Sequence, residues 1–232
     1  MKKVIVAPEY NFLRDYIEDI PGRFHTIGTV LHAKRNIIRE DCVKGTRLVI
    51  KSFGGIYLPN RIRYTYFYPS KAQRAFENAK ILLQKGFNTP RPIAYIEITW
   101  NGLIDQMYFI CEFTDFQPLN VIIGTSTEKI LPLLLEIAHH TFRLHQNNIY
   151  HIDYSSGNIL FRKNNNKYEL ALIDNNRMKF GSITFEKGIR NFVRLELSDE
   201  HMTLIVKEYS RLWSVDEMIG IRHLFRYKRI HV

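Results

Sequence analysis

The chain has 232 residues, of which 45% are hydrophobic and 13% aromatic, which is enough to bury one substantial core or two smaller ones and excludes a disordered chain. Its most apolar stretches, 107–113 and 130–138, are far shorter than the roughly 20 residues of a membrane-spanning helix. The formal charge of +10 predicts an anionic partner: a phosphorylated small molecule, an anionic membrane face or nucleic acid.

The amino terminus and the cysteines predict a cytoplasmic protein. The short apolar run that follows two lysines is ended by Pro8 and Glu9 before the core of a signal peptide has formed. Cys42 and Cys111 lie far apart in apolar, strand-like surroundings, which favours two buried free thiols over a disulfide. We therefore expect a soluble or peripheral protein in a reducing compartment.

The first half of the chain predicts a sheet with one embedded helix. The helix begins after Ser70, which forms a capping box with Gln73, and its apolar residues recur at helical spacing until Gly86 ends it. Segments rich in Val, Ile, Tyr and Phe are predicted strands: 29–33, 47–53, 93–99 and 107–113.

The second half predicts mainly helices. A helix over 128–146 carries one apolar stripe, and strands 158–162 and 168–173 form a hairpin. Further helices follow Ser198 and Ser214, and Ser214 with Glu217 is predicted to cap the last one as a second capping box. The basic residues of 221–232 favour a solvated helix face over a binding surface. The predicted fold class is α+β with two lobes: a strand-rich lobe over 1–113 and a helical lobe over 114–232.

The segment HIDYSSGN is the strongest chemical signal. It spaces His151, Asp153 and Asn158 as H-x-D-x-x-x-x-N and runs into a predicted strand. In phosphoryl transfer an aspartate here orients the acceptor hydroxyl, and the asparagine binds a divalent metal ion. Asp174 follows the next predicted strand, so Asn158 and Asp174 supply two oxygen ligands of the kind that Mg²⁺ prefers.

Upstream, a lysine lies in the middle of an apolar strand, where a cation is costly without a partner. This residue, Lys51, is expected to pair with Glu77 on the following helix, near the edge of its apolar face. The pair would hold the lysine against the α- and β-phosphates of a nucleotide. Each of these residues alone has a structural explanation, whereas their common order along the chain points to phosphoryl transfer.

The order Lys51, Glu77, Asp153, Asn158 and Asp174 resembles the protein-kinase-like superfamily. More narrowly, the stretches VIKSF, SKAQRAFENAKILLQKGFNTPRPIAYIE and LIDNNRMKF make residues 28–180 similar to the lipopolysaccharide kinase family, which phosphorylates heptose or 3-deoxy-octulosonic acid of the inner core. The resemblance implies ATP and Mg²⁺ as cofactors, Asp153 and His151 as catalytic residues, and a sugar or anionic glycolipid as acceptor. It also implies peripheral contact with the inner face of the membrane.

Where a kinase carries a glycine-rich phosphate loop, this chain has IGTVLHAKRNIIRED, and Lys34 and Arg35 are the candidates to clamp phosphates there with side-chain charge. DNN stands in place of DFG, and no A-P-E segment follows Asp174. This second departure disfavours a regulated protein kinase with an activation loop and favours a compact glycan or small-molecule kinase, or an atypical protein kinase of the RIO type.

A different class of function stays open, namely a pseudokinase that uses the same surfaces to bind a partner without catalysis. The missing glycine loop favours this alternative, whereas the retained metal ligands and hydroxyl-orienting aspartate disfavour it. Nucleic acid is not expected as a partner, because no recognised binding motif accompanies the positive charge. The sequence leaves the oligomeric state open.

Overall fold

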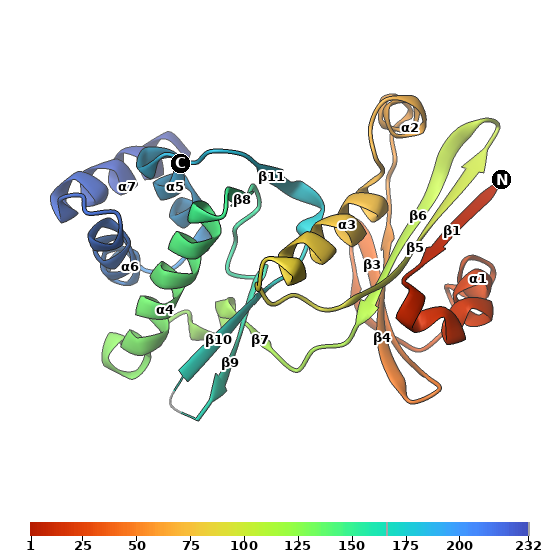
Figure 1. Cartoon of the computed structure of the whole chain (residues 1–232), viewed down its shortest axis with the longest axis horizontal. Helices are drawn as coiled ribbons and strands as arrows, with labels where there is room; N and C mark the ends of the chain where they lie inside the picture. Colours follow the sequence, from red (N-terminus) through yellow and green to blue (C-terminus); the bar gives the residue numbers. More distant parts are fainter. Residues whose placement is uncertain (166, 232) are drawn as a thin grey trace. The chain divides into compact units, whose positions relative to one another are not determined.

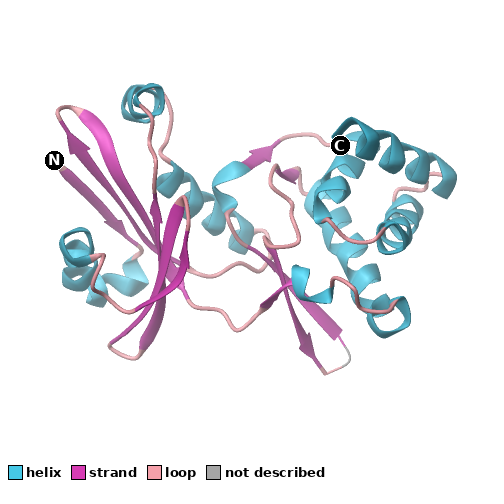
Figure 2. Ribbon diagram, turned by 180° about the vertical axis from the view of Figure 1, so that it is seen from behind, coloured by secondary structure: helices cyan, strands magenta, loops and turns pink. Residues whose placement is uncertain are grey.

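The computed structural model describes residues 1–165 and 167–231, and the chain divides into two compact units, Met1–Thr114 and Asp115–Val232. Each unit has its own secondary structure (Figures 1 and 2). Within the described residues, no helix combines the length and the apolar character that crossing a membrane requires.

The first unit is built on a six-stranded antiparallel sheet in the order β1-β5-β6-β4-β3-β2. Along β4 the fully buried residues Leu48 and Ile50 alternate with partly exposed ones, which indicates that one face of the strand is covered more completely than the other. Its elements are β1 (Lys2–Val6), a 3-10 turn (Pro8–Leu13), α1 (Arg14–Arg23), β2 (Thr29–Ala33), β3 (Asn36–Val43), β4 (Thr46–Phe53), α2 (Leu58–Tyr66), α3 (Lys71–Gln84), β5 (Pro92–Trp100) and β6 (Leu103–Glu112).

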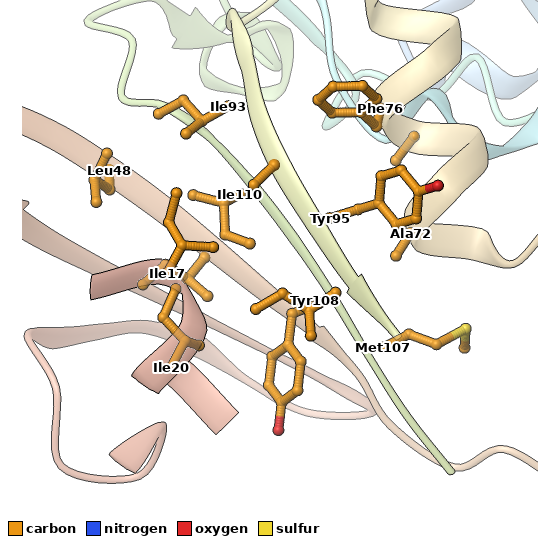
Figure 3. Close-up of a cluster of buried hydrophobic side chains, with 14 of the residues drawn as sticks. Ile17, Ile20, Leu48, Ala72, Phe76, Ile93, Tyr95, Met107, Tyr108 and Ile110 are labelled. Atoms are coloured by element: carbon orange, nitrogen blue, oxygen red, sulfur yellow. The ribbon is translucent and has the colours of Figure 1, made fainter. Parts of the chain in front are cut away.

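Two helices cover the two faces of this sheet (Figure 3). Ile17 and Ile20 of α1 are fully buried on the face that presents Leu48. On the other face Phe76 of α3 packs on Tyr95 of β5, with ring centroids 5.5 Å apart. The apolar stripe predicted for the helix after Ser70 therefore faces the sheet, and the Ser70 hydroxyl accepts a hydrogen bond from the Gln73 amide as the capping box requires.

The second unit is mainly helical and contains two small sheets, one in the order β10-β9-β7 and one that pairs β11 with β8. Its elements are β7 (Gln117–Pro118), a 3-10 turn (Leu119–Ile122), α4 (Thr127–Gln146), β8 (Ile149–His151), β9 (Ile159–Asn164), β10 (Lys167–Leu172), a 3-10 turn (Asn175–Arg177), β11 (Met178–Phe180), α5 (Phe185–Phe192), a 3-10 turn (Val193–Leu195), α6 (Asp199–Leu212) and α7 (Glu217–His231). Residue 166, between β9 and β10 in the sequence, lies outside the described residues.

All predicted strands and helices are present, but the sequence reasoning missed strands β1, β3, β7, β8 and β11 and helices α1, α2 and α5. The predicted cap of the last helix was wrong. Ser214 has a left-handed backbone (φ 55°), and the Asp216 carboxylate instead accepts from the Met218 amide at 2.8 Å. An aspartate nearer the first turn competes successfully for the free amides of the helix.

The prediction that both cysteines are buried was correct for one of them. Cys111 of β6 is a buried free thiol, and burial raises its pKa to about 12. Cys42 is also free but is exposed near the end of β3. Cys42 lies between Asp41 and Val43, and neighbours along a strand do not decide whether a side chain is covered, because successive side chains point to opposite faces.

Candidate active site

The segment after β8 folds around a neutral histidine. The imidazole Nδ1 of His151 accepts a hydrogen bond from the Asp153 amide at 3.2 Å, so Nε2 carries the proton and donates to the Ile173 carbonyl at 3.1 Å. Burial lowers the pKa of His151, which keeps this one-donor, one-acceptor form. His151 thereby ties the loop that carries Asp153 to the residue just before Asp174.

Asn158 closes the other side of the same loop. Its side-chain amide donates to the Asp153 carbonyl at 2.9 Å, and its backbone carbonyl accepts from the Ile173 amide at 3.0 Å. The remaining polar atom of the side chain is Oδ1, an oxygen of the type that hard cations prefer. These bonds set Asn158, the residue just before β9, beside the segment that leads to Asp174.

Asp174 follows β10 with a left-handed backbone conformation, φ 58° and ψ 44°. Aspartate tolerates this region better than most residues, and one of its carboxylate oxygens accepts from the Asn176 side-chain amide. Asn158 and Asp174 together offer oxygen donors only, and the described residues contain no group of three or more His, Cys, Asp and Glu side chains placed as metal ligands. This donor set fits Mg²⁺, which keeps waters and phosphate oxygens as its other ligands, and not a zinc centre.

Two arginines flank the Asp153 carboxylate. Arg177 Nη1 lies 3.5 Å from Oδ2 and Arg194 Nη1 lies 3.7 Å from Oδ1, while the Asp153 side chain keeps 31% of its surface exposed. Sequence reasoning missed both residues. Arg177 lies three residues after Asp174 and belongs to the same LIDNNR stretch, which could have indicated it, whereas nothing local to Arg194 does so.

A buried chain of hydrogen bonds from α4, α5 and α6 supports the loop that carries Asp153. The Asn191 amide of α5 donates to the His151 carbonyl at 3.0 Å, and its oxygen accepts from Nε2 of His145 on α4 at 2.9 Å. The other ring nitrogen of His145 accepts from the Tyr209 hydroxyl of α6 at 2.6 Å. The donor–acceptor direction is fixed at each step, because only one arrangement of protons satisfies every group.

The hydrogen-bonded chain from Tyr209 to His151 depends on a neutral His145. Burial lowers the pKa of His145 to about 4, although its hydrogen bond to Asn191 acts in the opposite direction. Gly188 of α5 permits the close packing, since a Cβ there would lie 2.1 Å from the Tyr209 hydroxyl and 2.8 Å from His145 Nδ1. The glycine is thus required by a close approach and not by its backbone angles.

In the first unit, Lys51 lies on a central strand of the sheet. It is opposite Ile38 of β3 and Phe109 of β6, and Phe109 in turn is opposite Tyr95 of β5. Residues directly opposite each other in antiparallel strands share a face, so Lys51 lies on the same face as Tyr95. That is the face covered by α3, the helix that carries Glu77.

Glu77 lies next to Phe76 at the edge of this contact. Its carboxylate is close enough to Tyr95 to contribute to the raised pKa of that phenol, for which burial is the largest cause. It also forms an ion pair with Lys80 at 3.7 Å, in which both side chains are about half exposed. The fold therefore brings Lys51 and Glu77 to one face of one sheet, and the ion pair between them stays a prediction.

Lys34 and Arg35 form the exposed turn between β2 and β3. The Lys34 amide donates to the Asn36 carbonyl at 3.2 Å, and the Arg35 carbonyl approaches Gly54 so closely that a Cβ on Gly54 would lie 2.2 Å from it. Sequence reasoning missed Gly54, although two adjacent glycines directly after an apolar strand mark a close backbone approach.

The family model of the lipopolysaccharide kinase (Kdo/WaaP) family matches residues 52–215, well over half of the chain. The chain belongs to the lipopolysaccharide kinase (Kdo/WaaP) family. As a lipopolysaccharide kinase it is a phosphotransferase, as the spacing of His151, Asp153 and Asn158 predicts. A search of curated proteins by sequence gives no match.

Two solved structures are similar to this lipopolysaccharide kinase. "WaaP in complex with acyl carrier protein" matches with a TM-score of 0.67 and 14% identity over 98% of each chain. The Rio2 kinase–ADP/Mg²⁺–phosphoaspartate complex from Chaetomium thermophilum matches with a TM-score of 0.52 and 17% identity over 95% of this chain and 68% of the other. At these identities the likeness establishes the fold, and the predicted α+β, protein-kinase-like class is confirmed.

Proposed function

We propose that this lipopolysaccharide kinase transfers the γ-phosphate of ATP, in the presence of Mg²⁺, to a hydroxyl of an inner-core sugar. The observation that supports this best is the fold of the HIDYSSGN loop, in which His151 and Asn158 both bond to Asp153 and to Ile173, the neighbour of Asp174. A loop so constrained holds a carboxylate and two metal ligands in fixed relation, and positioning is the main work in phosphoryl transfer.

In this proposal Asp153 orients the acceptor hydroxyl and accepts its proton as that oxygen bonds to the γ-phosphorus, while the bond from the γ-phosphorus to the β–γ bridging oxygen breaks and ADP leaves. Asn158 and Asp174 hold Mg²⁺, which neutralises charge on the phosphates when it is bound. His151 is a positioning residue, since both of its ring nitrogens are used within the loop. The structurally similar Rio2 kinase is a complex with ADP and Mg²⁺, which supports the same cofactors here.

The first unit supplies the nucleotide-binding residues of the proposal. Lys51 neutralises the α- and β-phosphates and is oriented by Glu77 on the same face of the sheet. Lys34 and Arg35 add positive charge from the β2–β3 turn, where other kinases use backbone amides of a glycine-rich loop. The lobes over 1–113 and 114–232 thus divide the work between nucleotide binding and catalysis.

An anionic glycolipid acceptor is supported by Arg177 and Arg194. Both guanidinium groups are about half exposed and lie within 4 Å of the Asp153 carboxylate. An acceptor that presents a carboxylate or phosphate near its reacting hydroxyl can exchange for Asp153 as their ion-pair partner. The proposal places the enzyme in the cytoplasm, at the membrane face where such an acceptor is available.

The deciding experiment compares wild type with Asp153→Asn, using γ-labelled ATP and lipopolysaccharide core acceptor. The variant should retain thermal stabilisation by ATP with Mg²⁺ and lose transfer, because the amide cannot accept the hydroxyl proton. The Gln146→Ala variant, which truncates an exposed side chain at the end of α4 outside the loop, is the matched control. Full transfer by Asp153→Asn would refute the assignment.

The same assay separates the alternatives. An atypical protein or small-molecule kinase of the RIO type would label a protein or a soluble alcohol in place of the glycolipid. A silent binding module would show neither transfer nor stabilisation by ATP with Mg²⁺.

A further inference from the structure

The first unit exposes an unusual concentration of large apolar side chains around α2. Phe67 is 79% exposed, Tyr57 72% and Tyr66 65%, far more than a surface helix normally leaves in water. We call the whole set the α2 surface; its members are Tyr57, Leu58, Ile62, Tyr66, Phe67, Tyr68 and, at the end of β5, Trp100.

Helix α2 is attached to the sheet by its polar side. Arg61 Nε donates to the Ile104 carbonyl at 2.8 Å, and the Thr65 hydroxyl accepts from the Ile104 amide at 2.9 Å. Arg61 also forms an ion pair with Asp105 at 3.2 Å, and its Nη2 reaches the Trp100 carbonyl at 3.5 Å. The side of α2 that faces the sheet thus carries Arg61 and Thr65 beside the partly buried Tyr64, whereas most of its apolar residues are on the side that usually carries polar ones.

Apart from Tyr64, which packs against the core, the apolar side chains of α2 are exposed. Leu58, Ile62 and Tyr66 follow one another at four-residue spacing, which aligns them on one face of the helix, and all three are exposed. Figure 1 shows α2 standing out from its unit beside the outer end of β6.

The α2 surface also carries positive charge without any negative charge from its own segment. Residues 54–76 contain four basic residues and no Asp or Glu. The guanidinium groups of Arg63 and Arg74 lie 4.7 and 5.0 Å from the centroid of the Tyr68 ring, which holds both cations at the border of the aromatic cluster.

We propose that the α2 surface docks on an anionic lipid bilayer. Tyr and Trp side chains favour the headgroup level of a membrane, because one part of each ring is apolar and another part forms hydrogen bonds. Basic residues beside an exposed apolar helix face complement anionic headgroups. This inference goes beyond the proposed reaction and does not depend on it, although docking would bring the enzyme to a glycolipid acceptor.

The test is co-sedimentation with vesicles of equal parts phosphatidylcholine and phosphatidylglycerol, without ATP or acceptor. Wild type should bind these vesicles, bind phosphatidylcholine alone much more weakly, and dissociate as salt is raised. The double variant Tyr66→Ser with Phe67→Ser should lower the partition coefficient at least tenfold, since it removes two exposed aromatic rings. Arg63→Glu should lower it roughly thirtyfold at low salt, because one positive charge near the surface is replaced by a negative one.

Phe12→Ser is the matched control, because Phe12 is a half-exposed phenylalanine of the same unit that lies outside the α2 surface. It should bind vesicles like wild type, and all variants should keep the wild-type unfolding midpoint. The proposal is overturned by absent binding of wild type, by equal binding of the double variant, or by an equal loss in Phe12→Ser. It is also overturned if the double variant instead abolishes a dimer or a complex with an acidic protein, measured by sedimentation velocity.

Discussion

Truncation of Asn191 to alanine should weaken both the fold of the second unit and the reaction. Asn191 is 1% exposed and bonds to the His151 carbonyl and to His145 Nε2, so its loss leaves two buried polar groups without their partner. Each such group costs about 1–3 kcal/mol, which gives a loss of about 2–6 kcal/mol in the free energy of unfolding. Domains typically have about 5–15 kcal/mol in total, so the effect is easily measured.

The functional consequence follows from the position of His151. Its carbonyl would lose the bond that anchors the loop bearing Asp153, and a misplacement of about 1 Å can cost on the order of a hundredfold in rate. We expect kcat to fall at least tenfold while KM for ATP changes little, because the proposed nucleotide contacts lie in the first unit.

The assay is urea unfolding followed by circular dichroism, paired with steady-state transfer kinetics at a temperature where the variant stays folded. Tyr209→Phe removes only the hydroxyl that donates to His145, and it should lower the free energy of unfolding by about 1–3 kcal/mol. This variant tests the far end of the hydrogen-bonded chain. Gln146→Ala should change the free energy of unfolding by no more than about 0.5 kcal/mol. A loss below about 1 kcal/mol for Asn191→Ala with unchanged kcat would refute the supporting role.

Three further outcomes are expected. Gly188→Ala should destabilise by at least about 3 kcal/mol in urea unfolding, because its Cβ would overlap the Tyr209 hydroxyl, whereas Gly22→Ala, with open space around it, should be neutral or stabilising. Burial lowers the pKa of His145 to about 4 and that of His140 to about 3, below the unfolded value of 6.5. The two neutral histidines therefore contribute fully to the free energy of unfolding above pH 6.5, and this contribution is lost as pH falls toward 4. The free energy of unfolding should drop by about 1.4 kcal/mol per pH unit for each histidine, and a flat profile from pH 6.5 to 4.5 would contradict this. Arg194→Gln should raise KM for an anionic acceptor about tenfold and leave KM for ATP unchanged; an unaltered acceptor KM would exclude Arg194 from recognition.

Local patterns determined much of the fold and of the candidate site. The cap at Ser70, the strand that carries Lys51 and the loop from His151 to Asn158 are encoded within a few residues, because caps, strand alternation and tight turns depend on neighbours along the chain. Strands β1 and β3 and helices α1 and α2 could not be predicted in this way. In α2 the apolar stripe is exposed, so sequence analysis that expects apolar residues at helical spacing to be buried does not predict this helix.

By itself, then, the sequence of this kinase determined the order of its chemical groups: Lys51, Glu77, Asp153, Asn158 and Asp174. Only the tertiary structure decided which groups support them. Arg194 reaches Asp153 across 41 positions, and Asn191 reaches the His151 carbonyl across 40. Contacts over such separations depend on how α4, α5 and α6 pack, and side-chain packing in a dense core is a collective property that no local pattern contains.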